Sequence, residues 1–318
     1  MATRTFSSEV KEELARVYPE KKCCALAELA AIARRNGTVT IGENGEIGFY
    51  FVSEQTSLAR KVYRLMRELY ADKMELTVKQ QVGNRQRSRY MLRLNPCDET
   101  AAILQSMGIL SSGKRIIPGI KKDLIRNKCC QRAYLRGAFL AGGSISSLER
   151  DYHMELSASN ERFAKDLLAL LNRFSGMHSK ISRRKQSYIV YLKDSDQIAD
   201  FLTIIEAHGH LLEYENARVY RSMKNQVKRN VNLETANLDK ISHAAARQVN
   251  QITLIQERIG LDSLEPSLAQ VARLRLENPD ISLEELGEII TPPLGKSGVN
   301  HRLRKISEIA EKLNKNPV

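Results

Sequence analysis

The sequence predicts an α+β protein in which a duplicated unit precedes an all-helical C-terminal region. The first observation is an internal repeat: Lys22-Cys23-Cys24 recurs as Lys128-Cys129-Cys130, and the same shift of 106 positions takes Gly37 to Gly143. The second is the order of periodicities, because helical and alternating segments follow one another in both copies, whereas the last eighty or so residues are helical only. Units of this length are too long for a solenoid and predict a duplicated domain with a pseudo-twofold axis.

Each copy begins with a helix rich in small side chains, and strands follow it. The apolar segments Ala25–Ala33 and Ala133–Ala141 are each followed by glycine, which is typical of a helix end. Alternating segments come next, Thr38–Val52 in copy one and Tyr152–Leu156 in copy two. Residues 43–45 (Glu-Asn-Gly) favour a hairpin turn within the first of them.

An amphipathic helix, a second hairpin and a last helix complete each copy. The amphipathic helices carry apolar residues at helical spacing: Val62, Leu65, Met66 and Leu69 in copy one, and Phe163, Leu167, Leu170, Leu171 and Phe174 in copy two. The second hairpins pair Glu75–Val82 with Arg89–Leu94 and Ser179–Arg183 with Tyr188–Leu192. The last helices begin near Asp98 and near Asp196, so the repeats span about 20–112 and about 126–210 of a domain over residues 1–210.

The glycine-terminated helices carry a resemblance to a known family. Leu135-Arg-Gly-Ala-Phe-Leu-Ala-Gly-Gly143 is a close variant, and Leu29-Ala-Ala-Ile-Ala-Arg-Arg-Asn-Gly37 a weaker one, of the motif of the LAGLIDADG homing endonucleases. This resemblance implies two αββαββα units whose motif helices pack together through small side chains. It also implies two saddle-shaped sheets that lie on DNA.

The positions that hold catalytic acids in that family are neutral in this sequence. The enzymes it resembles place a carboxylate just before the final glycine of each motif, and the pair binds divalent metals; Asn36 and Gly142 stand there instead. A hard cation needs anionic oxygen ligands, so we expect no catalytic residue, no metal and no cofactor. Glu28 lies two turns earlier, and the nearby loop acids have no counterpart in the other copy. A residual metal-dependent nuclease remains an alternative.

The second hairpins are basic in both copies. Their cations are Lys79, Arg85, Arg87 and Arg89 in copy one, and Lys180, Arg183, Arg184 and Lys185 in copy two. A single run of charge usually marks a solvated face. Because two matching runs occur on the elements that follow the duplex in the family resembled, we expect secondary DNA contacts from them.

The C-terminal region has the order of elements of a helix-turn-helix. A basic linker is expected over residues 211–232, followed by a helix from Thr235 to Gly260 and a second helix over Ser267–Leu276. A capping box, Ser282 with Glu285, begins a third helix that ends at Ile290. Residues 291–295 (Thr-Pro-Pro-Leu-Gly) form a turn, and Lys296–Leu313 is the fourth helix of an all-α helix-turn-helix domain over 233–318.

The fourth helix has an apolar face and a basic face. Val299, Leu303, Ile306 and Leu313 recur at helical spacing, which predicts burial. The predicted DNA-binding residues are Lys296, Ser297, Asn300, His301, Arg302, Arg304 and Lys305. Arginine pairs well with guanine and asparagine with adenine, while lysine and arginine also neutralise phosphates. The alternative is a solvated face of a bundle helix.

Four segments resemble the WhiA family of transcription regulators: Tyr134–Ser144, Asn232–Lys240, Glu257–Ser263 and Lys296–Lys305. The resemblance implies a degenerate homing-endonuclease domain fused to a helix-turn-helix, acting in sporulation septation and cell division. An interaction hub for division proteins or the chromosome, with secondary DNA binding, is the alternative function.

Composition agrees with a nucleic-acid partner. The net charge of +13 over 318 residues favours a polyanion, and we expect double-stranded DNA, with a regulatory or division protein as a further partner. The sequence has no long apolar run and no signal-peptide pattern, so a cytoplasmic, nucleoid-associated protein is expected. The internal twofold is compatible with a monomer. The five cysteines lack C-x-x-C spacing, which predicts reduced thiols and no zinc.

Overall fold

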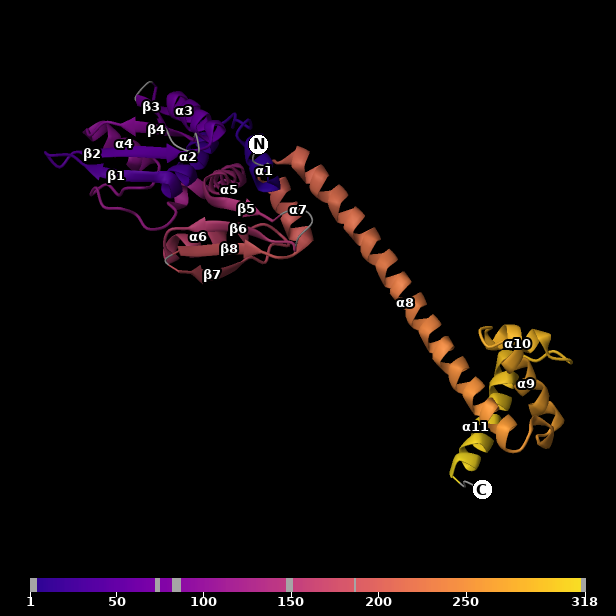
Figure 1. The fold of residues 1–318 in the computed structure, drawn as a ribbon. Coiled ribbons are helices and arrows are strands. Elements are labelled where there is room, and N and C mark those ends of the chain that lie inside the picture. The colour runs from indigo at the N-terminus through magenta and orange to yellow at the C-terminus, as the bar shows by residue number, and fades with distance from the viewer. Residues whose placement is uncertain (1–4, 72–74, 82–86, 147–150, 186, 316–318) are drawn as a thin grey trace. The chain divides into compact units, whose positions relative to one another are not determined.

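The structure is a computed structural model that describes residues 5–71, 75–81, 87–146, 151–185 and 187–315. The chain divides into two compact units, Met1–Ser222 and Met223–Val318 (Figure 1). Among the described residues, no helix has the length and apolarity needed to cross a membrane.

The first unit consists of two copies of one arrangement, preceded by helix α1 (Phe6–Leu14). Copy one contains α2 (Lys22–Asn36), β1 (Gly37–Ile41), β2 (Ile47–Ser53), α3 (Thr56–Tyr70), β3 (Glu75–Gln81), β4 (Arg87–Leu94) and α4 (Asp98–Ser106). Copy two contains α5 (Lys128–Gly142), β5 (Gly143–Ile145), β6 (Met154–Ala158), α6 (Glu161–Leu171), β7 (Lys180–Arg184), β8 (Ser187–Leu192) and α7 (Ser195–Ile204). A short 3-10 helix, η1 (Lys122–Ile125), lies between the copies. The αββαββα prediction is confirmed for both copies.

The two sheets have the same antiparallel topology. Their strand orders are β1-β2-β4-β3 and β5-β6-β8-β7. The predicted first hairpin turns at Gly45, which has a φ of 76° that glycine adopts without strain. The second strand of copy two begins at Met154, two residues later than predicted. Strand β5 was not predicted, because three residues are too few to show an alternating pattern.

Helices α2 and α5 pack against each other where the two repeats meet (Figure 1). Their contact is a backbone contact: a Cβ placed on Gly137 would lie 2.4 Å from the carbonyl oxygen of Glu28. Small buried residues make this approach possible, among them Ala27, Ala31 and Ala133. The tight packing that the LAGLIDADG resemblance implies is therefore present, and it holds the ends of both helices between the sheets.

Residues 208–258 form one helix, α8 (His208–Arg258). The segment over 211–232, predicted as a basic linker, is helical throughout and continues directly into the helix predicted from Thr235. No glycine or proline stands between His210 and Ile259, so nothing in this segment disfavours a continuous helix. The helix ends at Arg258, and Gly260 follows it with a φ of 76°.

The second unit is helical and has its own core. After α8 come the 3-10 helix η2 (Leu261–Ser263), α9 (Pro266–Glu277), α10 (Leu283–Ile289) and α11 (Lys296–Lys315). The end of α8 packs with the apolar faces of α9, α10 and α11 in one core cluster. The cluster includes Ile252, Ile255, Val271, Leu286, Val299, Leu303 and Ile306. The predicted order of short capped helix, turn and longer helix is confirmed.

Candidate nucleic-acid interface

The start of α10 is fixed by the capping box that the sequence predicts. The Ser282 hydroxyl accepts a hydrogen bond from the Glu285 amide at 3.2 Å, and the Glu285 carboxylate accepts one from the Ser282 amide at 2.8 Å. The bond from the Ser282 amide is the main reason that the pKa of Glu285 lies below its usual value. Two backbone donors at the helix start are thus satisfied, which sets where α10 begins.

The turn between α10 and α11 is held by a close backbone contact. The Leu294 amide donates to the Gly287 carbonyl at 2.9 Å, and a Cβ on Gly287 would lie only 2.1 Å from the carbonyl oxygen of Leu294. Glycine is therefore required within α10 by the close approach of the turn. This contact, together with buried Val299, fixes the start of α11 against α10.

A buried arginine holds the loop that precedes α10. Arg275 on α9 is 1% exposed, and its Nη1 donates to the Ile281 carbonyl at 2.7 Å and, at 3.4 Å, to the carbonyls of Asn278 and Pro279. Burial lowers the pKa of Arg275. The guanidinium ties this loop to α9 and so supports the helix-turn-helix, a role that the sequence pattern did not suggest.

Helix α11 has a buried face and an exposed basic face. Val299, Leu303, Ile306 and Ala310 are buried, whereas Leu313, which the sequence places with them, is only partly buried. Of the predicted DNA-binding residues, Lys296, Ser297, Asn300, His301, Arg304 and Lys305 are exposed, and Arg302 is half-buried. The side chain of Arg304 lies 3.8 Å from that of Glu308 in an exposed pair, which is weak and leaves the arginine able to bind elsewhere.

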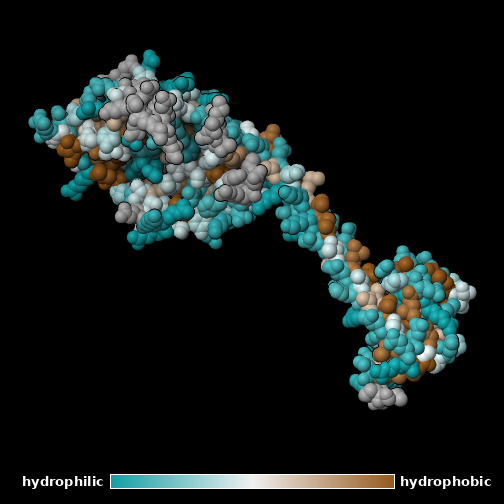
Figure 2. Space-filling model, in the orientation of Figure 1, coloured by the Kyte–Doolittle hydropathy of each residue, from teal (hydrophilic) through white to brown (hydrophobic). Residues whose placement is uncertain are grey.

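The basic hairpins contribute to the sheet surfaces in different ways. In copy one, Lys79 of β3 stands opposite Arg89 of β4 in the strand register. Arg89 and Arg93 lie on the same face of β4, and both are exposed. The side chains of Lys79 and Arg87 and the whole of Arg85 lie outside the described residues. Figure 2 shows mainly hydrophilic residues on the visible face of the first unit.

The four cations of copy two do not share one face. Lys180 and Arg184 alternate with Arg183 along β7, and Lys185 lies in the turn with a φ of 54°. All four are exposed. Arg184 Nη1 lies 3.7 Å from Glu155 Oε2 on β6, so part of the arginine charge is neutralised.

A cation occupies the place where a homing endonuclease needs its second acid. A Cβ on Gly142 would lie 2.3 Å from the Ser157 hydroxyl and 3.1 Å from Arg35 Nε. Arg35 donates to Ser157 at 2.9 Å, and Ser157 donates to the Gly142 carbonyl at 2.9 Å. Lys11 of α1 is a second cation near Arg35: burial, and then repulsion from Arg35, lower the pKa of Lys11 to about 8. In the first copy, the buried Oδ1 of Asn36 has no hydrogen-bond partner within the described protein. The cation beside Gly142 therefore makes the second position unfavourable for a divalent metal ion.

Glu28, the remaining acid of the motif helices, is fully buried in an ion-pair network. Its Oε1 lies 2.6 Å from Lys61 Nζ, and its Oε2 accepts from Arg136 at 2.9 and 3.1 Å. Arg136 also donates to Glu206 at 2.5 Å. Both oxygens are thus engaged in the interior of the first unit.

Comparison with known proteins identifies the family. The WhiA N-terminal LAGLIDADG-like domain matches residues 22–110, the WhiA LAGLIDADG-like domain matches 131–224, and the WhiA C-terminal HTH domain matches 227–310. A probable cell division protein WhiA from Desulforamulus reducens is 45% identical over 310 residues, which cover 97% of this chain and 96% of that protein. The chain belongs to the WhiA family.

Other WhiA proteins agree over nearly the whole length. A probable cell division protein WhiA from Desulfitobacterium hafniense strain Y51 is 47% identical over 309 residues, covering 97% of this chain and 96% of that protein. The crystal structure of full-length DUF199/WhiA from Thermatoga maritima is similar with a TM-score of 0.58 and 26% identity, covering 97% of this chain and 99% of that one. The predicted family and fold class are confirmed.

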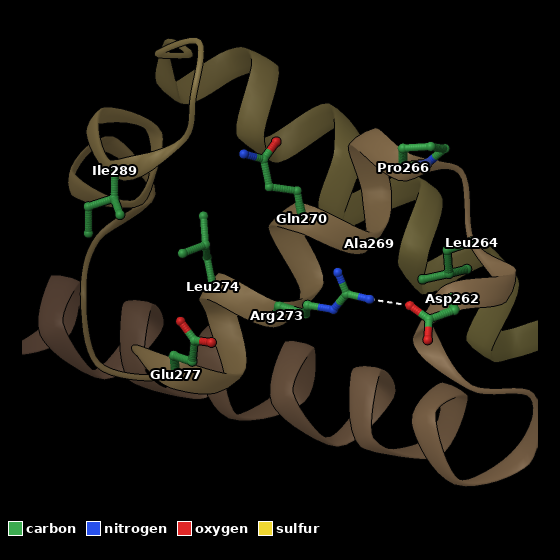
Figure 3. A pocket seen from close by; sticks show the side chains of 9 residues that line it. All are labelled: Asp262, Leu264, Pro266, Ala269, Gln270, Arg273, Leu274, Glu277 and Ile289. Carbon is green, nitrogen blue, oxygen red and sulfur yellow. Dashed lines mark hydrogen bonds and ion pairs between the residues drawn. The ribbon is translucent and has the colours of Figure 1, made fainter.

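The WhiA helix-turn-helix unit also contains a pocket of about 460 Å³ beside α9 (Figure 3). Arg273 forms an ion pair with Asp262 in its lining, and Gln270 donates to the Thr291 carbonyl at 3.2 Å. The lining contains none of the predicted DNA-binding residues. Gln270 thus links α9 to the turn before α11, and Arg273 links α9 to η2.

Proposed function

We propose that this WhiA-family protein is a sequence-specific DNA-binding transcription regulator of cell division or sporulation-type septation, and that it does not cleave DNA. The exposed basic face of α11 carries the proposal, because it combines Asn300 and Arg304 with flanking lysines on a helix that α10 and the turn hold in place. The relatives named as probable cell division proteins support the cellular process.

Within this proposal, base recognition and backbone binding fall to different residues. Asn300, His301 and Arg304 lie on the exposed face of α11 and reach base edges in the major groove. Lys296, Ser297, Arg302 and Lys305 bind phosphates around them. The exposed cations of the two sheets add electrostatic attraction to the duplex. The proposed place of action is the nucleoid in the cytoplasm, and the internal twofold is compatible with a monomer.

The absence of cleavage rests on the surroundings of Gly142. Arg35 and Ser157 fill the space of the second carboxylate, and Glu28 is held by Lys61 and Arg136. Supercoiled plasmid incubated with the full chain and Mg²⁺ or Mn²⁺ is expected to stay intact. Nicking that disappears in Glu28→Gln would instead show that this acid supports a nuclease.

Arg304→Ala tests the recognition helix. Its probe is a duplex obtained by selecting random double-stranded DNA on the full chain. Loss of a base contact should cost about 1–3 kcal/mol, which raises Kd about 5- to 150-fold, and should relax the selected sequence. Lys312→Ala is the matched control, because Lys312 is an exposed cation in the last turn of the same helix.

Fluorescence anisotropy on the selected and on a shuffled duplex separates the outcomes. Equal weakening on both duplexes would make Arg304 a phosphate contact. If Arg304→Ala and Lys312→Ala bind like the unsubstituted chain, the assignment of α11 as the recognition helix is wrong.

A further inference from the structure

Four cysteines from the two repeats meet at one place. Cys23 and Cys24 lie in the first turn of α2, and Cys129 and Cys130 lie in the first turn of α5. The four sulfur atoms all lie within 4.8 Å of one another, and Cys24 Sγ is 4.0 Å from Cys130 Sγ. The packing of α2 against α5 thus converts two local Lys-Cys-Cys segments into one cluster.

The spacing of the sulfurs fits a single tetrahedral metal ion. A Zn–S bond of about 2.3 Å places the sulfurs of a tetrahedral site about 3.8 Å apart. No sulfur pair is more than about an ångström wider than that distance, a difference that a small rotation of each side chain would remove. A cluster that places several iron atoms and sulfides between the thiolates requires wider spacing, so a mononuclear site is the better fit.

The electrostatic surroundings favour a metal with four thiolates. Zinc with four thiolates carries two negative charges, and the positive ends of two helix dipoles meet at the sulfurs. Lys22 and Lys128 begin the two helices directly beside the cysteines. Neither helix has an acidic residue in its first turn that would oppose this charge.

Burial divides the four ligands into two pairs. Cys24 and Cys130 are buried, whereas Cys23 and Cys129 are exposed. The buried pair holds the cluster between the helices, and the exposed pair leaves an entry path for an ion. We propose that Cys23, Cys24, Cys129 and Cys130 bind one zinc ion that joins the two repeats at the start of their motif helices.

This site differs from the expectation of no zinc, which rested on the lack of C-x-x-C spacing. Ligand spacing along the chain detects sites built from one segment. Here each repeat supplies an adjacent pair, and the second pair is 106 positions away. The repeat itself was the available signal, because a pseudo-twofold axis brings equivalent residues of two packed helices close together.

The metal content of the full chain tests the proposal. Chain purified with a reductant and without chelator should contain one zinc per molecule by mass spectrometry. Titration of the metal-free chain with Co²⁺ should give the intense d–d and sulfur-to-cobalt bands of a tetrahedral thiolate site, with saturation at one equivalent. This titration uses the unsubstituted chain and does not depend on whether a variant folds.

The double variant Cys23→Ser/Cys129→Ser should lose both the zinc and the cobalt bands while keeping the circular dichroism of the folded chain. Cys97→Ser is the matched control, because Cys97 lies outside the cluster, and it should keep both. Four freely titrating cluster thiols with no bound zinc or cobalt would overturn the proposal. A Cys24–Cys130 disulfide that persists in chain purified with the reductant would also overturn it. Full metal binding by the double variant would do the same.

Discussion

Arg136→Met is expected to destabilise the first unit strongly, because it removes one cation from a buried network. Arg136 and Glu28 have side-chain exposures of 3% and 0%, and Glu28 also contacts Lys61, whose side chain is 0% exposed. Burial lowers the pKa of Lys61 in spite of the attraction of Glu28. Two cations and one carboxylate therefore share an interior site, with Glu206 as the partly exposed second acid.

The magnitude follows from what the substitution leaves behind. Methionine fills much of the arginine volume, so the cavity term is small. Glu28 Oε2, on a side chain that is 0% exposed, loses its donors at 2.9 and 3.1 Å. Removing one partner of a buried ion pair costs about 3–5 kcal/mol, and the cost here should lie toward the lower end of that range because Lys61 still pairs with Oε1.

Urea unfolding of the full chain, followed through the transition of the first unit, measures the effect. Lys165→Met is the matched control: its exposed i,i+4 pair with Glu161 has side-chain exposures of 62% and 56%, so the cost should be below about 1 kcal/mol. If Arg136→Met costs no more than Lys165→Met, the network does not hold the motif helices together. The same result would leave Glu28 free to take part in other chemistry.

Two further perturbations test the support of α11 and the join between α1 and α8. Gly287→Ala should lower the melting temperature of the second unit and weaken binding to every duplex, because the added Cβ would lie 2.1 Å from the Leu294 carbonyl oxygen. Gly295→Ala is the control and should change neither, because a Cβ there has no atom within 4 Å. Equal melting temperatures for the two variants would refute this role for Gly287. Burial raises the pKa of Glu13, but hydrogen bonds from the His210 side chain and from backbone amides at the start of α8 outweigh it and leave the pKa below 4.5. A lowered carboxylate pKa stabilises the fold above the unfolded-state value and loses that contribution as pH falls through the folded-state value. Urea unfolding at neutral and at acidic pH should therefore show that Glu13→Gln loses less stability on acidification than the unsubstituted chain. An equal loss in both would refute a stabilising contact between Glu13 of α1 and the start of α8.

The sequence predicted what depends on local pattern and missed what depends on packing between distant segments. The repeat, both hairpins and the capped helix at Ser282 follow from periodicity and turn chemistry. The roles of Arg35 and Arg275 could not be predicted, since each is defined by a contact with a residue or loop that only the fold places nearby. Helix α1 was missed because its few apolar residues bury against the other elements and form no long stripe.

The neutral residues at the former acid positions and the cysteine cluster lie at opposite ends of the same two helices. Helices α2 and α5 place Asn36 and Gly142 at one end and the four sulfurs in the first turns at the other. At the first end, Arg35 of α2 donates to Ser157 of β6, and Ser157 donates to the carbonyl of Gly142 at the end of α5, so the two helices are linked through this hydroxyl. In a nuclease that end must stay open for metal and water, whereas a regulator needs only that the helices stay paired. A zinc ion at the opposite end would strengthen the same pairing, so both features favour a rigid DNA-binding scaffold over a reaction site.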